Sequence, residues 1–177
     1  MNNGMCRTLL TLAILIGASM PAAACSIVYG SDWAFASETP KNWESACGNS
    51  AMEGTSITLW PAKESPSNAS ALIYVTVSDK DPAGLAAFAE DEQAKFKRSS
   101  PASSVSQLSA PPETHKFKYV LARYNHASGN REELVAYMEG PNVYYIIVLT
   151  AKSEAVLATY RSAFLEYVEG FIPMERK

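Results

Sequence analysis

The sequence predicts an α/β fold built on an antiparallel sheet, and the clearest evidence lies near its C-terminal end. Residues 143–150 indicate a strand with two apolar faces. Val143, Tyr145, Ile147 and Leu149 fall on one face, and Tyr144, Ile146 and Val148 fall on the other. A strand that is apolar on both faces is typical of the middle of a sheet that is covered on both sides. We therefore expect residues 143–150 to form the central strand.

The segment that follows predicts the helix that covers this strand. Apolar residues recur at steps of three and four over residues 153–171, which is the period of an amphipathic helix. Burying one large apolar side chain stabilises a protein by roughly 1.5–3 kcal/mol, so a strand and a helix this apolar are expected to pack together.

The first 24 residues have the features of a secretory signal peptide. Arg7 is their only charged residue, the apolar run over residues 9–16 is too short to span a bilayer, and Pro21 and three alanines precede the expected cleavage point. We therefore expect a signal peptide over residues 1–24 and one domain over residues 25–177. The protein is expected to be periplasmic or secreted.

Cys25, the first residue after this leader, leaves two interpretations open. Cys6 is lost with the leader, so Cys25 and Cys47 remain as a pair, which in an exported protein is typical of a disulfide. Such a bridge would contribute about 3 kcal/mol on the chain-entropy model. Alternatively, the small residues before Cys25 are similar to the lipobox of membrane-anchored bacterial lipoproteins, although Ala22 stands where that motif usually has leucine.

Charge and hydropathy restrict the classes of partner. The formal net charge is −3, and removal of Arg7 with the leader makes it one unit more negative. Without a basic run, the chain gives no reason to expect nucleic acid as a partner. No second apolar segment is long enough to cross a membrane, so no transmembrane span is predicted in the mature chain.

The N-terminal half of the domain predicts two strands after an irregular segment. Residues 26–50 are expected to be irregular, with Trp33, Phe35 and Trp43 packed against the edge of the sheet. Residues 55–60 and 71–78 alternate apolar and polar side chains, as half-buried strands do.

The second half predicts a helix, a loop and three strands. Asp81 and Pro82 are typical of the start of a helix, which is expected to run to Lys97. Residues 99–112 are rich in Ser, Ala and Pro and indicate a surface loop. Residues 117–125 and 132–139 are further strands, and the short links between them and residues 143–150 predict an antiparallel meander under the last helix.

This order of elements resembles that of the PsbP-like superfamily, which includes bacterial exported proteins of the DcrB type. The resemblance lies in the Pro40-Lys41-Asn42-Trp43 turn, the strands at residues 57–61 and 73–77, the Asp81-Pro82 helix, the meander and the closing helix that ends at Phe171. It implies an α/β/α sandwich with a central, mainly antiparallel sheet flanked by helices. It also implies a non-enzymatic role in binding or assembly, and it transfers no individual binding residue.

The residues that could carry catalysis are not arranged for it in the sequence. No Gly-x-Ser-x-Gly motif and no cysteine spacing for zinc is present. His115 and His126 fall at opposite ends of one predicted strand and are expected to be solvated loop residues. Glu132 and Glu133 are adjacent on a strand, so they are expected to point to opposite faces. The sequence predicts no catalytic residue, no cofactor and no metal site.

Aromatic residues of the predicted sheet are the candidates for a binding surface. Trp60, Tyr124, Tyr137 and the neighbouring Arg123 could contact a protein partner, because tyrosine, tryptophan and arginine are enriched at interfaces. The interpretation that the pattern favours over a binding surface is cross-strand packing in a sheet covered on both faces.

The first functional hypothesis is a non-catalytic exported binding or assembly protein with a protein partner. An immunity-type inhibitor of a secreted toxin fits the same features. A second hypothesis is a carrier or receptor for a small apolar ligand held between the sheet and the loop at residues 99–112. A hydrolase would require the fold to place His115 or His126 in a cleft beside a carboxylate.

Overall fold

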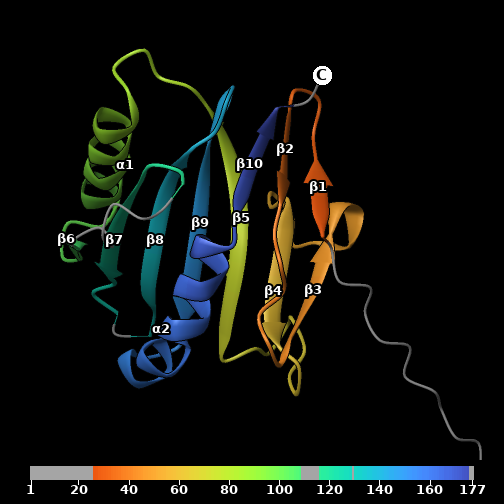
Figure 1. Ribbon diagram of the computed structural model, residues 1–177. Helices are drawn as coiled ribbons and strands as arrows, with labels where there is room; N and C mark the ends of the chain where they lie inside the picture. The colour runs from red at the N-terminus through yellow and green to blue at the C-terminus, as the bar shows by residue number, and fades with distance from the viewer. Residues whose placement is uncertain (1–25, 109–115, 129, 176–177) are drawn as a thin grey trace, which may run out of the picture.

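The computed structural model describes residues 26–108, 116–128 and 130–175. These residues form a seven-stranded sheet with helix α1 (Leu85–Ser99) on one face and helix α2 (Glu154–Glu169) on the other, where a small three-stranded sheet lies beside α2 (Figure 1). The expectation of an α/β fold with a central antiparallel sheet flanked by helices is confirmed.

The seven-stranded sheet is antiparallel at every pairing between its neighbours. Its central strand, β9 (Val143–Ala151), pairs with β5 (Ala71–Asp79) on one side and with β8 (Glu132–Glu139) on the other, which confirms the predicted position of residues 143–150. Strand β7 (Tyr119–Asn125) forms the predicted meander with β8 and β9. In spatial order, the strands are β3 (Trp43–Cys47), β4 (Ile57–Pro61), β5 (Ala71–Asp79), β9 (Val143–Ala151), β8 (Glu132–Glu139), β7 (Tyr119–Asn125) and β6 (Ser104–Leu108), and the short 3-10 helix η1 (Gly48–Ser50) follows β3.

Each face of β9 belongs to a separate core. On the α2 face, its alternate side chains pack with Leu157, Phe164 and Phe171. On the α1 face, Tyr144 stacks on Phe88, with the ring centroids 4.6 Å apart. The two-residue period of the strand therefore distributes its apolar side chains between two cores.

The small sheet corrects the expectation that residues 26–50 are irregular. It consists of β1 (Ile27–Tyr29), β2 (Trp33–Ala36) and β10 (Ile172–Glu175), with β2 in the middle. Strand β10 comes from the C-terminal end of the chain and pairs antiparallel with β2. Strands of three or four residues are too short for a recognisable alternation, and this pairing joins segments that are far apart in the sequence.

Helix α1 begins later than the sequence predicts. Asp81 does not cap the helix but closes a turn, in which its Oδ1 accepts a hydrogen bond from the Ala83 backbone N–H at 2.8 Å. The N-cap is Gly84, with φ 91° and ψ 173°. The expected inward residues are confirmed, since Phe88 and Ala89 are buried and Leu85 and Phe96 pack against the same core.

Part of the expected loop at residues 99–112 is a strand. Ser104–Leu108 forms β6, which pairs with β7 and is an edge strand of the large sheet. Its side chains are mostly exposed, and this lack of an apolar pattern explains why the sequence indicates a loop. Residues 109–115 lie outside the described part of the chain.

Candidate functional site

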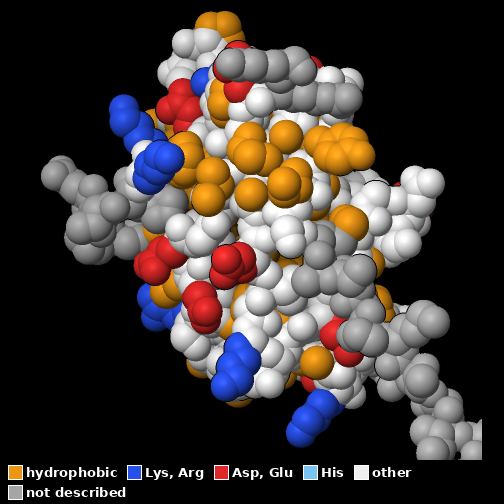
Figure 2. Space-filling view, turned by 45° about the vertical axis from the view of Figure 1, so that its right-hand side comes forward, with side chains coloured by type: hydrophobic (Ala, Val, Ile, Leu, Met, Phe, Trp, Pro, Cys, Tyr) orange, Lys and Arg blue, Asp and Glu red, His pale blue; other side chains and the backbone are white. Residues whose placement is uncertain are grey.

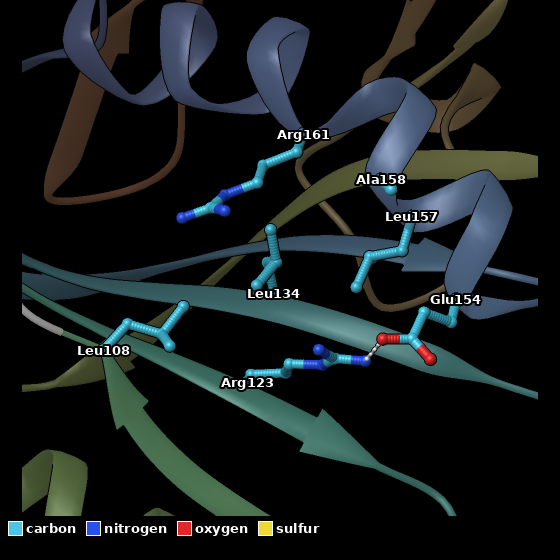
Figure 3. A pocket seen from close by; sticks show the side chains of 7 residues that line it. All are labelled: Leu108, Arg123, Leu134, Glu154, Leu157, Ala158 and Arg161. Carbon is cyan, nitrogen blue, oxygen red and sulfur yellow. Dashed lines mark hydrogen bonds and ion pairs between the residues drawn. The ribbon is translucent and has the colours of Figure 1, made fainter.

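A groove between α2 and the β6–β8 end of the sheet is the cavity that best combines charged and apolar side chains. Its volume is about 270 Å³. Figure 3 shows Arg161 reaching from α2 across the space above Leu134, while Arg123 extends from β7 along the opposite wall. The lining residues are Leu108, Arg123, Leu134, Glu154, Leu157, Ala158 and Arg161.

Arg123 is held by two carboxylates of very different exposure. Its Nη2 donates to Glu132 Oε2 at 3.2 Å and to Glu154 Oε1 at 2.9 Å. The Glu132 side chain is 13% exposed, whereas that of Glu154 is 74% exposed. The hydrogen bond to Glu154, followed by that to Glu132, raises the pKa of the Arg123 guanidinium above its ordinary value. Arg123 is therefore a fixed cation at one end of the groove.

The two arginines of the groove have hydrogen-bond donors that no acceptor in the described residues uses. The Nε of Arg123 is buried and has no hydrogen-bond partner among the described residues. Arg161 is exposed and forms no ion pair with any residue in the described ranges. A buried N–H without an acceptor is unusual in folded proteins, because such a group loses its hydration without compensation. Arg161 thus offers unused donors beside an apolar floor, whereas the unpaired Arg123 Nε is enclosed by the protein.

The opposite face of the same strands carries a buried polar cluster beneath α1. Tyr124 and Tyr137 share a hydrogen bond between their hydroxyl groups, and burial raises the pKa of both phenols. Phe96 of α1 packs edge-on against Tyr124 with ring centroids 4.8 Å apart. Both tyrosines are core residues of the α1 face, at 4% and 3% exposure.

His126 lies in the loop after β7, as expected, but its side chain is only 20% exposed and not solvated as the sequence predicts. His126 Nε2 lies 3.0 Å from Glu133 Oε2, and its ring packs against Phe96. Glu133 Oε1 also forms an ion pair with Arg131, whose Nε lies 3.2 Å away and donates its hydrogen bond to Thr150 Oγ1. The fold therefore places His126 beside a carboxylate, one of the requirements of a hydrolase. No hydroxyl or thiol of the described residues hydrogen-bonds to His126. His115 lies outside those residues.

The outer face of the small sheet is apolar at every paired position. The register places Ile27, Ala36 and Ile172 in one cross-strand row, and Tyr29, Ala34 and Met174 in the next, where Ala34 is buried. Ile27, Tyr29 and Ile172 are 59%, 69% and 45% exposed. Figure 2, turned to bring this side forward, shows an apolar patch here. We call these six residues the outer face of the small sheet.

Comparison with known proteins identifies the fold. No protein-family model matches the sequence, and a search of the curated proteins finds no match. Among solved structures, cyanobacterial PsbP (CyanoP) from Synechocystis has 16% sequence identity and a TM-score of 0.50, with 88% of this chain and 97% of that chain covered. The fold is PsbP-like.

A protein from Bacteroides thetaiotaomicron is a more distant structural neighbour. It has 11% identity and a TM-score of 0.43, with 81% of this chain and 45% of that chain covered. This likeness is too weak to support an argument. The CyanoP likeness concerns the fold alone, so the functional residues of this PsbP-like chain have to come from its own geometry.

Within the PsbP-like fold, the four candidate partner residues do not form one surface. Tyr124 and Tyr137 lie together beneath α1, whereas Arg123 points into the groove on the α2 face. Trp60 is 7% exposed in β4, three strands away from β8. The residues that sequence reasoning missed are Arg161 and Glu154, which belong to α2, and the outer face of the small sheet.

Two further features concern metals and membranes. The described part of the PsbP-like fold contains no group of three or more His, Cys, Asp or Glu side chains that could hold a metal ion. Within the same ranges, no helix is both long and apolar enough to cross a bilayer. Cys25 lies outside the described residues, and Cys47 ends β3, half-buried against the α2-face core.

Proposed function

We propose that the chain is a non-catalytic exported protein with a role in binding or in assembly. It contacts its protein partner through the outer face of the small sheet. The exposed apolar character of that face carries the proposal. A strand that is apolar on both sides is typical of a sheet covered on both sides. Here Val28, Phe35 and Pro173 form the covered inner face, and the outer face is equally apolar.

The size and composition of this face support a protein as the partner. Contiguous exposed apolar patches on soluble proteins commonly mark interaction sites. Tyr29 adds an aromatic ring with a polar tip, which is a frequent central residue of protein interfaces. Of the large apolar side chains that are exposed in the described ranges, Ile27, Tyr29 and Ile172 lie on this one face, and Met52 lies elsewhere.

The test is site-specific photo-crosslinking in the organism that makes the protein. A photoreactive residue at position 29 is compared with one at position 90, because Glu90 is exposed on α1. We expect a discrete protein adduct from position 29 and none from position 90. Adducts that are absent at position 29, or the same at both positions, would contradict the proposal. An immunity-type inhibitor would give a secreted toxin as the crosslinked protein.

The export part of the proposal rests on the leader at residues 1–24. We propose that the mature chain begins at Cys25 and that Cys25 forms a disulfide with Cys47. Strand β1 begins two residues after Cys25, and Val28 packs in the same core as Cys47. The intact mass decides between the alternatives. A disulfide removes two hydrogen atoms, an acylated Cys25 adds lipid mass, and a chain that still begins at Met1 would contradict export.

A carrier for a small ligand is the second candidate function, and the groove at Arg123 favours it. The groove is bordered by Leu108 and the sheet, as that hypothesis expects, but α2 forms its other wall. The two arginines also change the expected ligand from purely apolar to anionic.

A further inference from the structure

We propose that the groove between α2 and the sheet binds a small organic anion with an apolar tail, of the class of medium-chain carboxylates. This inference goes beyond the protein-binding role. It concerns a different surface, because the groove lies along the first half of α2, whereas the small sheet packs beyond its C-terminal end through Phe171.

The floor of the groove fits the tail of such a ligand. Leu134 of β8 and Leu157 of α2 are buried side chains of the same apolar core and line the groove, together with Leu108 of β6. The volume of about 270 Å³ is small, so it suits a short alkyl chain. Burial of each CH₂ group on this floor removes apolar surface from water and therefore tightens binding.

The two arginines fit the head group. Figure 3 shows the guanidinium groups of Arg123 and Arg161 pointing toward opposite ends of the groove. Because Arg161 is exposed, its side chain can turn toward Arg123, so that a carboxylate between them accepts hydrogen bonds from both planar groups. Arg123 uses its Nη2 for both carboxylates it already holds, and its Nε has no partner within the described chain. Arg161 forms no ion pair there either, so its donors are available for the ligand.

Glu154 occupies the place that we assign to the ligand carboxylate. It is the first residue of α2, and its exposed side chain can exchange a protein contact for water at little cost. Glu132 is much less exposed and remains with Arg123. When a ligand carboxylate replaces Glu154, the two arginines still face two carboxylates. The groove therefore stays electrically balanced, and Glu154 competes with the ligand.

Titration calorimetry on the mature protein tests the ligand class with three probes. Octanoate has both head and tail, octanol has the tail without the charge, and acetate has the charge without the tail. We expect octanoate to bind at least about tenfold more tightly than either of the others, since each lacks one half of the contacts. Equal binding of octanol and octanoate, or of acetate and octanoate, would overturn the proposal, as would no binding of octanoate.

Three variants test the site. Arg161→Leu is expected to weaken octanoate binding about tenfold through loss of a charge-assisted hydrogen bond. Glu154→Gln is expected to tighten it severalfold, because the competing charge is removed. The matched control is Arg98→Leu, which also removes an exposed arginine from a helix, but on the opposite face of the sheet. Equal effects of Arg161→Leu and Arg98→Leu, or weaker binding in Glu154→Gln, would contradict the assignment.

An NMR measurement gives a readout at the proposed contact itself. The Nε–H signal of Arg123 is expected to shift on addition of octanoate and to stay unchanged with octanol. Arg123 is not substituted, because its loss would leave the largely buried Glu132 without a partner. The crosslink at position 29 tests a separate surface, so failure of either proposal leaves the other unaffected.

Discussion

Glu132 and Glu133 are neighbours in the sequence, but their side chains lie on opposite faces of β8. Glu132 binds Arg123 on the α2 face, and Glu133 binds His126 and Arg131 on the α1 face. The two-residue period of a strand imposes this separation, and the sequence alone predicts it. The partners of each carboxylate come from other segments, which the period does not specify.

Tyr145 is one of several buried or half-buried tyrosines, with Tyr74, Tyr137 and Tyr167, whose ionisation is expected to lower stability at high pH. Its side chain is fully buried, and its hydroxyl donates to the Ala34 carbonyl at 2.6 Å, which links β9 to the small sheet. Burial raises the pKa of Tyr145 to about 12. An unfolded tyrosine ionises near pH 10. Between these values only the unfolded state loses the proton, so stability is complete below pH 10 and falls as the pH rises to 12.

The variant Tyr145→Phe should reduce this dependence. At neutral pH we expect a loss of about 1 kcal/mol in the free energy of unfolding, because the Ala34 carbonyl loses its donor. The decrease in the free energy of unfolding between pH 10 and 12 should become about 2 kcal/mol smaller, because one titrating phenol is removed. Urea unfolding at several pH values measures both, with the buried, non-titrating substitution Met138→Leu as the control. An unchanged slope would contradict the prediction.

At the scale of elements, the start of α1 depends on Gly84 rather than on the Asp81-Pro82 pair. Gly84 has φ 91° and ψ 173°, a backbone conformation that is almost restricted to glycine. A Cβ atom there would meet no other atom within 4 Å. Any cost of adding one therefore comes from the backbone and not from a steric clash.

Gly84→Ala is expected to lower the free energy of unfolding by about 1–3 kcal/mol. Gly170→Ala is the matched control, because Gly170 also caps a helix but has φ −82°, which any residue adopts. Its effect should stay within about 0.5 kcal/mol. Urea denaturation monitored by circular dichroism compares the two. Equal effects of both substitutions would contradict the role of the Gly84 backbone.

At the scale of the whole molecule, the two sheets share one core. Phe35 of the small sheet stacks on Phe171 at 4.5 Å between ring centroids and packs edge-on against Tyr145 of β9 at 5.6 Å. All three side chains are fully or almost fully buried. Because the small sheet has no core apart from this one, we expect it to unfold together with the large sheet.

Phe35→Ala should therefore destabilise the entire fold by about 3–5 kcal/mol and keep a single unfolding transition. Ile27→Ala in the same small sheet is the control, because Ile27 is 59% exposed and its truncation should change little. During urea unfolding, far-ultraviolet circular dichroism reports the secondary structure and near-ultraviolet circular dichroism reports the tertiary structure. Separate transitions, with the tertiary signal lost first, would show that the small sheet unfolds independently.

Part of the candidate site could be anticipated from the sequence. The sequence makes Arg123 a candidate by its place beside Tyr124, and Leu108 belongs to the loop expected to border a ligand. Arg161 and Glu154 could be recognised only as polar positions of an amphipathic helix. Their approach to Arg123 depends on how α2 crosses the sheet. For Glu154, this approach is a side-chain contact between residues that are 31 positions apart in the sequence.

The amino-acid sequence by itself determined the central position of β9, the meander and the buried faces of both helices. Apolar periodicity encodes these features because burial of one face is a property that each segment carries alone. Only the tertiary structure decided the pairing of β10 with β2, the burial of the Tyr124–Tyr137 pair and the groove at Arg123. Each of these depends on contacts between segments remote along the chain, and the period of one segment contains no information about which other segment will pack against it.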